Sequence, residues 1–263
     1  MAPRLLVVGG GKMGSALLNG LINAGWAPAA DLVVSDPVPA QRQRLTDTHP
    51  GLTVVDGPIA ADGAVLAVKP DVSEAVLRTL AATGITRVLS IVAGVSTARL
   101  EAVMPPGAVV VRSMPNTPSL IGAGVAAMSG GSAATGADLD WAEGILGAVG
   151  TVVRLPERQL DAVTGVSGSG PAYLFLVAEA LIEGAVSAGL PRDVSRQLVV
   201  GTLLGSARMM AETGDDPAEL RAAVTSPGGT TAAAVRTLEF KAVRSAFIEA
   251  VAAATERSRQ LGR

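Results

Sequence analysis

The chain has 263 residues, of which 49% are apolar but only 2% aromatic, so its core must be built from Ala, Val, Leu and Ile. The net charge is −2 and the basic residues are scattered, so we expect no nucleic-acid partner. The lack of Cys excludes disulfides and Cys-ligated zinc, and we expect no metal site. Gly or charge interrupts the apolar stretches and no signal peptide begins the chain, so we expect no membrane span and a cytoplasmic protein.

The first part of the chain alternates short apolar runs with helical patterns. We expect strands at residues 4–8, 32–34, 52–55, 64–68, 87–92 and 108–111, helices at 13–24, 39–48, 72–82 and 137–148, and edge strands at 124–128 and 151–155. Strands that are apolar throughout are typical of a parallel sheet covered by helices on both faces. We therefore predict an α/β domain over residues 1–157, with a doubly wound, mostly parallel sheet.

The strand signal stops after about residue 158. Helical patterns follow at residues 171–188, 191–213, 217–223 and 230–261. Gly201 and Gly205 lie one turn apart on one helix face, where another helix can pack closely. The second part, residues 158–263, is predicted to be an all-α domain whose long apolar helices suit an intertwined dimer.

A glycine-rich turn follows the first predicted strand and opens the first helix. It comprises Val8, Gly9, Gly10, Gly11, Lys12, Met13 and Gly14, which contain the pattern G-x-G-x-x-G. Gly9 permits the tight turn, Gly11 lets the main chain approach a pyrophosphate, and Gly14 lets helix and strand pack closely. The helix N-terminus offers unpaired N–H groups to the phosphates. These residues are expected to bind a dinucleotide on a Rossmann domain, although the pattern also fits a βα turn without ligand.

Ser35 and Asp36 end the second predicted strand, where the adenosine ribose is expected. Asp36 follows Gly14 by roughly 20 residues, the usual spacing for an acid that holds the ribose 2′-OH, which favours NAD(H). Ser35 can instead bind a 2′-phosphate, and Arg42 and Arg44 lie one to two helical turns further on, so NADP(H) stays open. Asp36 is alternatively a helix cap.

The fourth and fifth predicted strands end in two segments that are expected to face the nicotinamide. Ligands of open α/β sheets lie beyond the carboxyl ends of the strands. The residues at these two ends are Ala67, Val68, Lys69, Pro70, Ala93 and Gly94. Lys69 is alternatively a plain surface lysine.

Three further segments are rich in Gly, Pro and hydroxyl residues, namely 112–118, 166–173 and 225–231. In the last of these, two glycines flanked by hydroxyls begin a helix. Their N–H and O–H groups form a concave set of donors that binds a carboxylate or phosphate without a cationic side chain. An ordinary capped helix start explains the pattern equally well.

These segments together resemble the pyrroline-5-carboxylate reductase family over essentially the whole chain. The matching residues are Gly9–Gly14, Val68–Pro70, Ala93–Gly94, Arg112–Pro118, Ser167–Tyr173 and Thr225–Thr231, in the right order and spacing. The resemblance implies reduction of 1-pyrroline-5-carboxylate to L-proline, the last step of proline biosynthesis. It also implies a Rossmann domain followed by a helical dimerisation domain, with dimers often assembled into decamers.

The resemblance also assigns residues to the substrate. It implies that the Ser-Pro-Gly-Gly-x-Thr loop binds the substrate carboxylate and that its last Thr approaches the ring nitrogen. These roles fall on Ser226, Gly228, Gly229, Thr230 and Thr231, while Asn116 is expected beside the cofactor. The family commonly prefers NADPH and often accepts NADH.

The chain has few side chains that donate protons near neutral pH. His49 lies in a predicted surface loop, Lys12 in the phosphate loop and Lys241 in a C-terminal helix, which leaves Lys69 as the one well-placed cation. Carbonyl reduction usually needs a His or Lys acid, whereas a protonated imine arrives already electrophilic and needs mainly orientation. We therefore expect Thr231 and Lys69 to assist the reaction.

Two other functions fit part of the pattern. A β-hydroxyacid or prephenate-type dehydrogenase also joins a Rossmann domain to helices. Such enzymes need a Lys or His at the start of the helical domain, and residues 161–173 contain neither. A dinucleotide-binding sensor would bind the cofactor without turnover.

Overall fold

The computed structural model describes residues 3–262 and divides them into two compact units. One unit comprises the chain up to Ser169 together with the segment from Ala252 onward, and the other comprises Gly170–Val251. The first is the sheet unit and the second the helical unit, and each is described by itself. The expected division at residues 157 and 158 stays a prediction.

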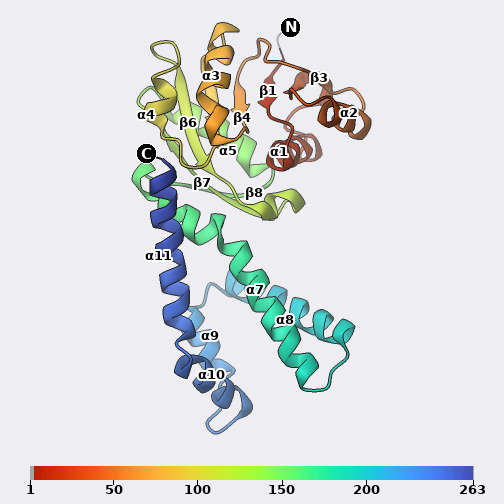
Figure 1. Ribbon diagram of the computed structural model, residues 1–263, viewed down its shortest axis with the longest axis vertical. Helices are drawn as coiled ribbons and strands as arrows, with labels where there is room; N and C mark the ends of the chain where they lie inside the picture. The colour runs from red at the N-terminus through yellow and green to blue at the C-terminus, as the bar shows by residue number, and fades with distance from the viewer. Residues whose placement is uncertain (1–2, 263) are drawn as a thin grey trace. The chain divides into compact units, whose positions relative to one another are not determined.

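The sheet unit is built on one eight-stranded sheet in the order β3-β2-β1-β4-β5-β6-β7-β8 (Figure 1). The strands are β1 (Leu5–Val8), β2 (Leu32–Ser35), β3 (Thr53–Val55), β4 (Ala64–Leu66), β5 (Arg87–Ser90), β6 (Val109–Met114), β7 (Gly124–Gly130) and β8 (Gly150–Arg154). The chain order reverses between β1 and β4, which is the point where open α/β sheets bind their ligands. The predicted doubly wound, mostly parallel sheet is confirmed.

One pair of strands runs antiparallel, and no sequence pattern indicated it. Met114 of β6 lies opposite Ala127 of β7, because the intervening loop is too short for a crossover to a parallel neighbour. A short 3₁₀ helix, Thr117–Ile121, fills that loop. β7 and β8 are again parallel, since the helix α5 (Gly136–Gly147) connects them.

Helices cover both faces of the sheet. They are α1 (Lys12–Asn23), α2 (Pro39–Thr48), α3 (Ser73–Ala82), α4 (Thr97–Glu101), α5 (Gly136–Gly147) and α6 (Leu160–Val163). The helices expected at 13–24, 39–48, 72–82 and 137–148 lie within a residue of α1, α2, α3 and α5. α4 has only five residues, too few for a periodic pattern to reveal it.

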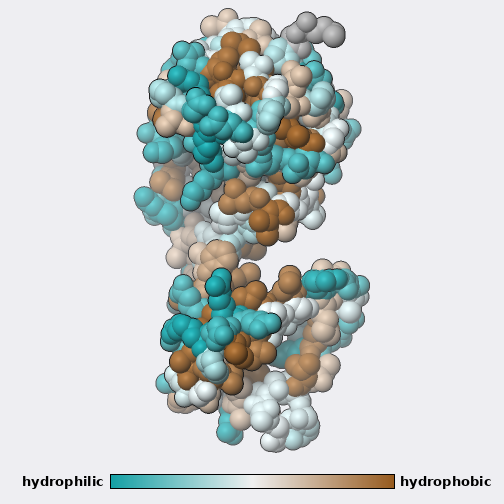
Figure 2. Space-filling model, turned by 90° about the vertical axis from the view of Figure 1, so that its right-hand side faces the viewer, coloured by the Kyte–Doolittle hydropathy of each residue, from teal (hydrophilic) through white to brown (hydrophobic). Residues whose placement is uncertain are grey.

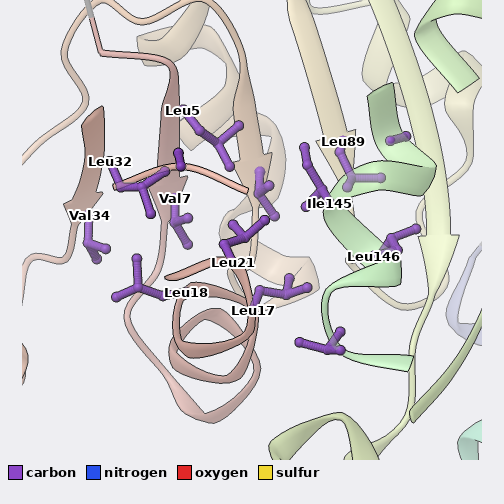
Figure 3. Packing of buried hydrophobic residues seen from close by; sticks show 14 of the residues in the cluster. Leu5, Val7, Leu17, Leu18, Leu21, Leu32, Val34, Leu89, Ile145 and Leu146 are labelled. Atoms are coloured by element: carbon purple, nitrogen blue, oxygen red, sulfur yellow. The ribbon is translucent and has the colours of Figure 1, made fainter. Parts of the chain in front are cut away.

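The two faces of β1 show why its sequence is apolar throughout. Leu5 and Val7 pack into a cluster with α1 and α5, while Leu6 and Val8 pack into a second cluster with α3 and α4. Figure 3 shows the first cluster, in which Leu17 of α1 and Ile145 of α5 are drawn together with Leu5 and Val7 of β1. Each such leucine contributes about 1.5–3 kcal/mol by leaving water, so the strand is anchored from both sides.

The helical unit contains helices without strands among its described residues. They are α7 (Gly170–Ser187), α8 (Arg192–Thr213), α9 (Pro217–Ala223), α10 (Thr230–Phe240) and α11 (Val243–Leu261), the last of which continues into the sheet unit. The single helix expected at residues 230–261 is wrong. Ala242 has a φ of 55°, a left-handed conformation that no helix interior accepts, and it separates α10 from α11.

Apolar side chains are unusually exposed on the helical unit. Phe175 and Leu176 of α7 and Leu204 of α8 are each about 60% or more exposed, and hydrophobic residues reach the surface of this unit in Figure 2. The helical run Glu157–Ser187 is long and apolar enough to cross a membrane, contrary to the expectation that interruptions would shorten it. One such helix is weak evidence of a membrane span. Exposed apolar area of this extent is typical of a surface that contacts another protein, a ligand or a membrane.

A buried arginine connects the end of the sheet with the helices that follow it. Arg112 of β6 is 7% exposed and donates to Glu157 Oε1 at 3.1 Å. Glu157 also accepts hydrogen bonds from the amide of Thr97 at 2.7 Å and from its hydroxyl at 2.6 Å. Asp161 lies 3.9 Å from Arg112 and accepts from the hydroxyl of Ser258 on α11 at 2.7 Å. Burial of the guanidinium is thus compensated by two carboxylates.

The end of α11 packs on the loop after β5. A Cβ at Gly94 would lie 3.3 Å from Leu261, and Gly94 itself has a φ of +77°. Arg99 donates to the carbonyl of Gly262 at 3.4 Å. The last turn of the chain therefore belongs structurally to the sheet unit.

The partly buried carboxylate of Glu157 predicts a pH-dependent contribution to stability. Burial raises the pKa of Glu157, but the hydrogen bonds from Thr97 and the nearby Arg112 outweigh it and hold the pKa below its ordinary 4.5. A carboxylate whose pKa is lower in the folded than in the unfolded protein stabilises the folded state. This stabilisation is complete at pH values above the ordinary pKa and is lost as the pH falls through the lowered pKa. At pH 7 we expect Glu157→Gln to lower the free energy of unfolding by about 1.5–3 kcal/mol, measured by chemical denaturation.

The difference between this variant and the unchanged protein should shrink as the pH falls below 4.5. Glu143→Gln is the matched control, because Glu143 forms an exposed ion pair with Arg154, which also contacts Asp140. We expect it to change stability by less than about 0.5 kcal/mol. A loss for Glu157→Gln that is equal at pH 7 and pH 4 would contradict this account.

Candidate active site

The glycine-rich turn between β1 and α1 is shaped by main-chain contacts. Gly9 has a φ of +100°, and a Cβ there would collide with the carbonyl of Ala67. A Cβ on Gly14 would collide with the carbonyl of Gly9. A Cβ on Gly11 would instead meet no atom within 4 Å in the described chain. Gly9 and Gly14 are therefore required by the fold, whereas the space beside Gly11 is open.

The same turn ends at an exposed helix N-terminus. Gly11 is the N-cap residue of α1 and, having no side chain, contributes no cap hydrogen bond. Lys12 and Met13 begin the helix, with Lys12 exposed. N–H groups at such a terminus, together with the helix dipole, attract phosphate. The geometry suits a pyrophosphate that lies against Gly11.

Asp36 lies just beyond β2 and fixes the turn from the side. The residue is 8% exposed, and its Oδ2 accepts a hydrogen bond from the amide of Gly10 at 2.9 Å. Its Oδ1 accepts from the amide of Val38 at 2.9 Å. Asp36 is therefore in contact with the glycine-rich turn. It is not the cap of the next helix, because the N-cap of α2 is Val38 and that helix has no side-chain cap hydrogen bond.

A cavity of about 300 Å³ opens beside these residues at the carboxyl ends of β1, β2 and β4. It is lined by Val8, Gly9, Ser35, Pro37, Asp56, Pro58, Val68, Val72, Val76 and Thr79. Most of the lining is apolar, and Ser35 and Asp56 add polar groups at its edge. Such a cavity accepts an adenosine, whose base is flat and whose ribose is polar. Sequence reasoning did not single out Asp56, because it follows a short strand without a motif.

The segments after β4 and β5 lie at the same edge of the sheet. Ala67 and Val68 are partly buried, and Lys69 and Pro70 are exposed where the chain leaves the sheet. Lys69 forms no ion pair with any residue between 3 and 262. After β5, Ala93 is partly buried and Gly94 is buried against the end of α11.

Asn116 has both polar ends of its side chain engaged with the protein. Its Oδ1 accepts from the amide of Val125 at 2.9 Å, and its Nδ2 donates to the carbonyl of Ser167 at 3.1 Å. Ser167 belongs to a π-helical turn, Thr164–Gly168, which leads into α7. Asn116 therefore positions the Ser-Gly-Ser-Gly segment, whose π-helical geometry no local pattern indicated.

The turn that precedes α10 presents open donors. Gly229 is the N-cap of α10 and its amide donates to the carbonyl of Ser226 at 3.0 Å, which closes the turn. Gly228 has a φ of +72°, which favours glycine. Ser226 and Thr230 are exposed, Thr231 is partly buried, and this part of the helical unit gives none of their hydroxyls a hydrogen-bond partner. A carboxylate can approach these hydroxyls and the helix N-terminus together.

Other candidate acids and ligands lie elsewhere. His49 caps the end of α2, and partial burial and the nearby Arg44 lower its pKa, which keeps it neutral at pH 7. Lys241 follows α10 and lies 5.8 Å from the ring of Phe240. Within residues 3–262, no group of three or more His, Cys, Asp or Glu side chains is arranged to hold a metal ion.

Comparison with known proteins agrees with this arrangement. Residues 157–261 match the family described as pyrroline-5-carboxylate reductase dimerisation, and residues 4–94 match NADP oxidoreductase, coenzyme F420-dependent. A pyrroline-5-carboxylate reductase of Synechocystis is 44% identical and aligns with 100% of both chains. That of Corynebacterium melassecola is 42% identical over 98% of both chains.

Solved structures give the same relationship. A pyrroline-5-carboxylate reductase from Coxiella burnetii has a TM-score of 0.91 at 34% identity and covers 100% of both chains. The Plasmodium falciparum protein with NADP bound has a TM-score of 0.88 at 30% identity, covering 99% of this chain and 98% of that one. Prephenate dehydrogenase from Aquifex aeolicus, at 13% identity and a TM-score of 0.54, shares the fold alone.

Full-length similarity, the matched dimerisation domain and the glycine-rich cofactor turn all agree. The chain belongs to the pyrroline-5-carboxylate reductase family.

Proposed function

We propose that this chain reduces 1-pyrroline-5-carboxylate to L-proline with the Ser226–Thr231 turn as its substrate site and the β1–α1 turn as its cofactor site. The chain is an NAD(P)H-dependent oxidoreductase of a cyclic imine. The open turn before α10 carries the proposal, because it offers amides and hydroxyls to an anion without a cationic side chain. Proline is formed when a hydride reaches the imine carbon and the ring nitrogen keeps its proton.

The residues in the sheet unit hold the cofactor. We assign the pyrophosphate to Val8, Gly9, Gly10, Gly11, Lys12, Met13 and Gly14, the ribose to Ser35 and Asp36, and the nicotinamide side to Ala67, Val68, Lys69, Pro70, Ala93, Gly94 and Asn116. When bound, the reduced nicotinamide supplies the hydride. The open space beside Gly11 and the cavity next to Ser35 support this assignment.

The turn before α10 orients the substrate. Ser226, Gly228, Gly229 and Thr230 surround the carboxylate of the ring, which the N-terminus of α10 also attracts. The hydroxyl of Thr231 accepts a hydrogen bond from the iminium N–H. The ring is thereby held by neutral groups, and its own positive charge makes the imine carbon electrophilic.

Lys69 contributes positive charge near the end of β4, where it attracts the anionic reactants. We expect Lys69→Met to raise the KM more than it lowers kcat, because a long-range attraction acts on the approach of the reactants rather than on the chemical step. Steady-state kinetics at low and high salt measure both constants. A variant that loses kcat at an unchanged KM would instead indicate that Lys69 acts on the reacting atoms.

The helical unit joins two copies of the chain. Exposed apolar side chains on α7 and α8, such as Phe175 and Leu204, are suited to burial against a second copy. We therefore propose that the chain forms a dimer, with a decamer of such dimers as the alternative. We also propose a cytoplasmic location. Light scattering of the purified protein measures this assembly.

The function is tested by following the absorbance of reduced nicotinamide with purified protein and pyrroline-5-carboxylate. We expect loss of absorbance only when substrate is present, with L-proline appearing in equal amount. Binding of the cofactor without turnover would favour a sensor. Loss of absorbance with a β-oxo acid in place of the imine would favour a β-hydroxyacid dehydrogenase.

Replacement of Gly11 by Ala separates the cofactor site from the fold. A methyl group there meets no protein atom within 4 Å, so we expect the thermal unfolding midpoint of the free protein to change by at most a few degrees. The methyl group would occupy the space of the pyrophosphate, and cofactor affinity should fall about tenfold or more in a fluorescence titration.

Gly147→Ala is the matched control, since a methyl group there also meets no atom within 4 Å in the described chain. It should leave cofactor affinity unchanged. Equal affinities of the Gly11 variant and the unchanged protein would remove the β1–α1 turn from the cofactor site.

Substitutions of Thr231 test whether its hydroxyl takes part in the reaction or its side chain only packs. We expect Thr231→Ala to lower kcat about 10- to 100-fold, the value of one hydrogen bond to a charged group, and Thr231→Ser to keep most of the activity. Thr237→Ala on the same helix, whose hydroxyl donates to the carbonyl of Ala233, should leave kcat unchanged. Full activity of Thr231→Ala in steady-state assays would exclude Thr231 from the reaction.

A further inference from the structure

The position of Asp36 is fixed by the main chain on two sides. The carboxylate accepts one hydrogen bond from Gly10 and one from Val38, both at 2.9 Å, in a residue that is 8% exposed. Turning the side chain away would leave the buried amide of Gly10 without its acceptor, which costs the desolvation of that group. The negative charge therefore stays where it is when a ligand arrives.

This fixed charge stands beside the cavity assigned to the adenosine. Ser35 and Pro37, the neighbours of Asp36 in sequence, both line the cavity, and Asp56 lines it as a second carboxylate. Each carboxylate oxygen of Asp36 uses one lone pair for an amide and keeps another for a ribose hydroxyl. A 2′-phosphate offers only acceptors and close to two negative charges, so it would face Asp36 with like charge.

The arginines on α2 do not reverse this balance. Arg42 donates to the carbonyls of Asp36 and Pro37, both at 2.9 Å. Arg44 donates to the hydroxyl of Ser15 at 3.1 Å and to the carbonyl of Gly10 at 3.3 Å. Both guanidinium groups thus already donate to oxygens of this edge, and pairing with a 2′-phosphate would compete with these hydrogen bonds.

We infer that Asp36 makes this chain prefer NADH to NADPH. The inference rests on the proposed function, because it assumes that the dinucleotide docks on the β1–α1 turn. It separates this chain from the Plasmodium falciparum relative, which was crystallised with NADP bound. It also gives Asp36 a role in specificity beyond its role in holding Gly10.

Two fragments that differ only in the 2′-phosphate test the inference directly. ADP-ribose and 2′-phospho-ADP-ribose are titrated into the purified full chain by calorimetry, and kcat/KM is measured with NADH and NADPH. We expect ADP-ribose to bind at least about tenfold more tightly, and NADH to be favoured by a similar ratio. In Asp36→Asn, which keeps one acceptor oxygen, both ratios should fall to within about threefold.

The control is Asp47→Asn, which removes a negative charge from α2 at a carboxylate that contacts only Gln43 among the described hydrogen bonds. It should leave both ratios unchanged. If Asp36 were only structural, Asp36→Asn would weaken both fragments by the same factor, and the unchanged ratio would overturn the inference. If Asp36→Asn fails to fold, the same two ratios are measured for Asp36→Ser. The ratios of the unchanged protein test the preference without any variant.

The outcomes also separate this inference from the proposed function. Tighter binding of 2′-phospho-ADP-ribose to the unchanged protein overturns the cofactor preference and leaves the reductase assignment standing. Failure of both fragments to bind overturns the preference together with the proposed cofactor site. Turnover of pyrroline-5-carboxylate is measured independently in both cases.

Discussion

The contact between the carboxylate of Asp36 and the amide of Gly10 is the constraint on which the cofactor edge of the sheet depends. It ties the end of β2 to the turn after β1 and so fixes the shape of the glycine-rich loop. Gly9 and Gly14 allow that shape because, without side chains, they can lie close to main-chain carbonyl groups. The result is a preformed surface that presents amides and one fixed negative charge. Preformed surfaces of this kind bind without the cost of ordering a loop.

Reduction of an imine agrees with the scarcity of His and Lys side chains in this protein. His49 caps a surface helix, and Lys241 lies beside the exposed ring of Phe240. An enzyme that reduces a carbonyl group needs an acid to protonate the oxygen. A protonated imine already carries its proton and its positive charge, so its reduction needs no such acid. In the proposed substrate site, the N-terminus of α10 and the hydroxyl of Thr231 would then hold the ring, because orientation is the main requirement.

Sequence reasoning predicted the sheet and most helices because each leaves a local pattern: apolar strands, a glycine-rich turn and a proline at the start of a helix. It failed where the decisive interaction is not local. The left-handed Ala242 that separates α10 from α11 carries no special residue type, and the antiparallel β7 depends on the length of one loop. The proposed cofactor residues follow from a motif, but the contacts of Asn116 with Val125 and Ser167 join segments that no spacing rule connects.

Leu261 and Gly262 pack against Gly94, so the sheet unit cannot be produced alone by simply truncating the chain. The unit is discontinuous in sequence, since the helical unit is inserted between Ser169 and Ala252. A fragment cut after Ser169 lacks the segment that covers Gly94 and the hydroxyl that binds Asp161. An isolated cofactor-binding unit therefore requires the final helical turns to be rejoined, for example by circular permutation through a short linker.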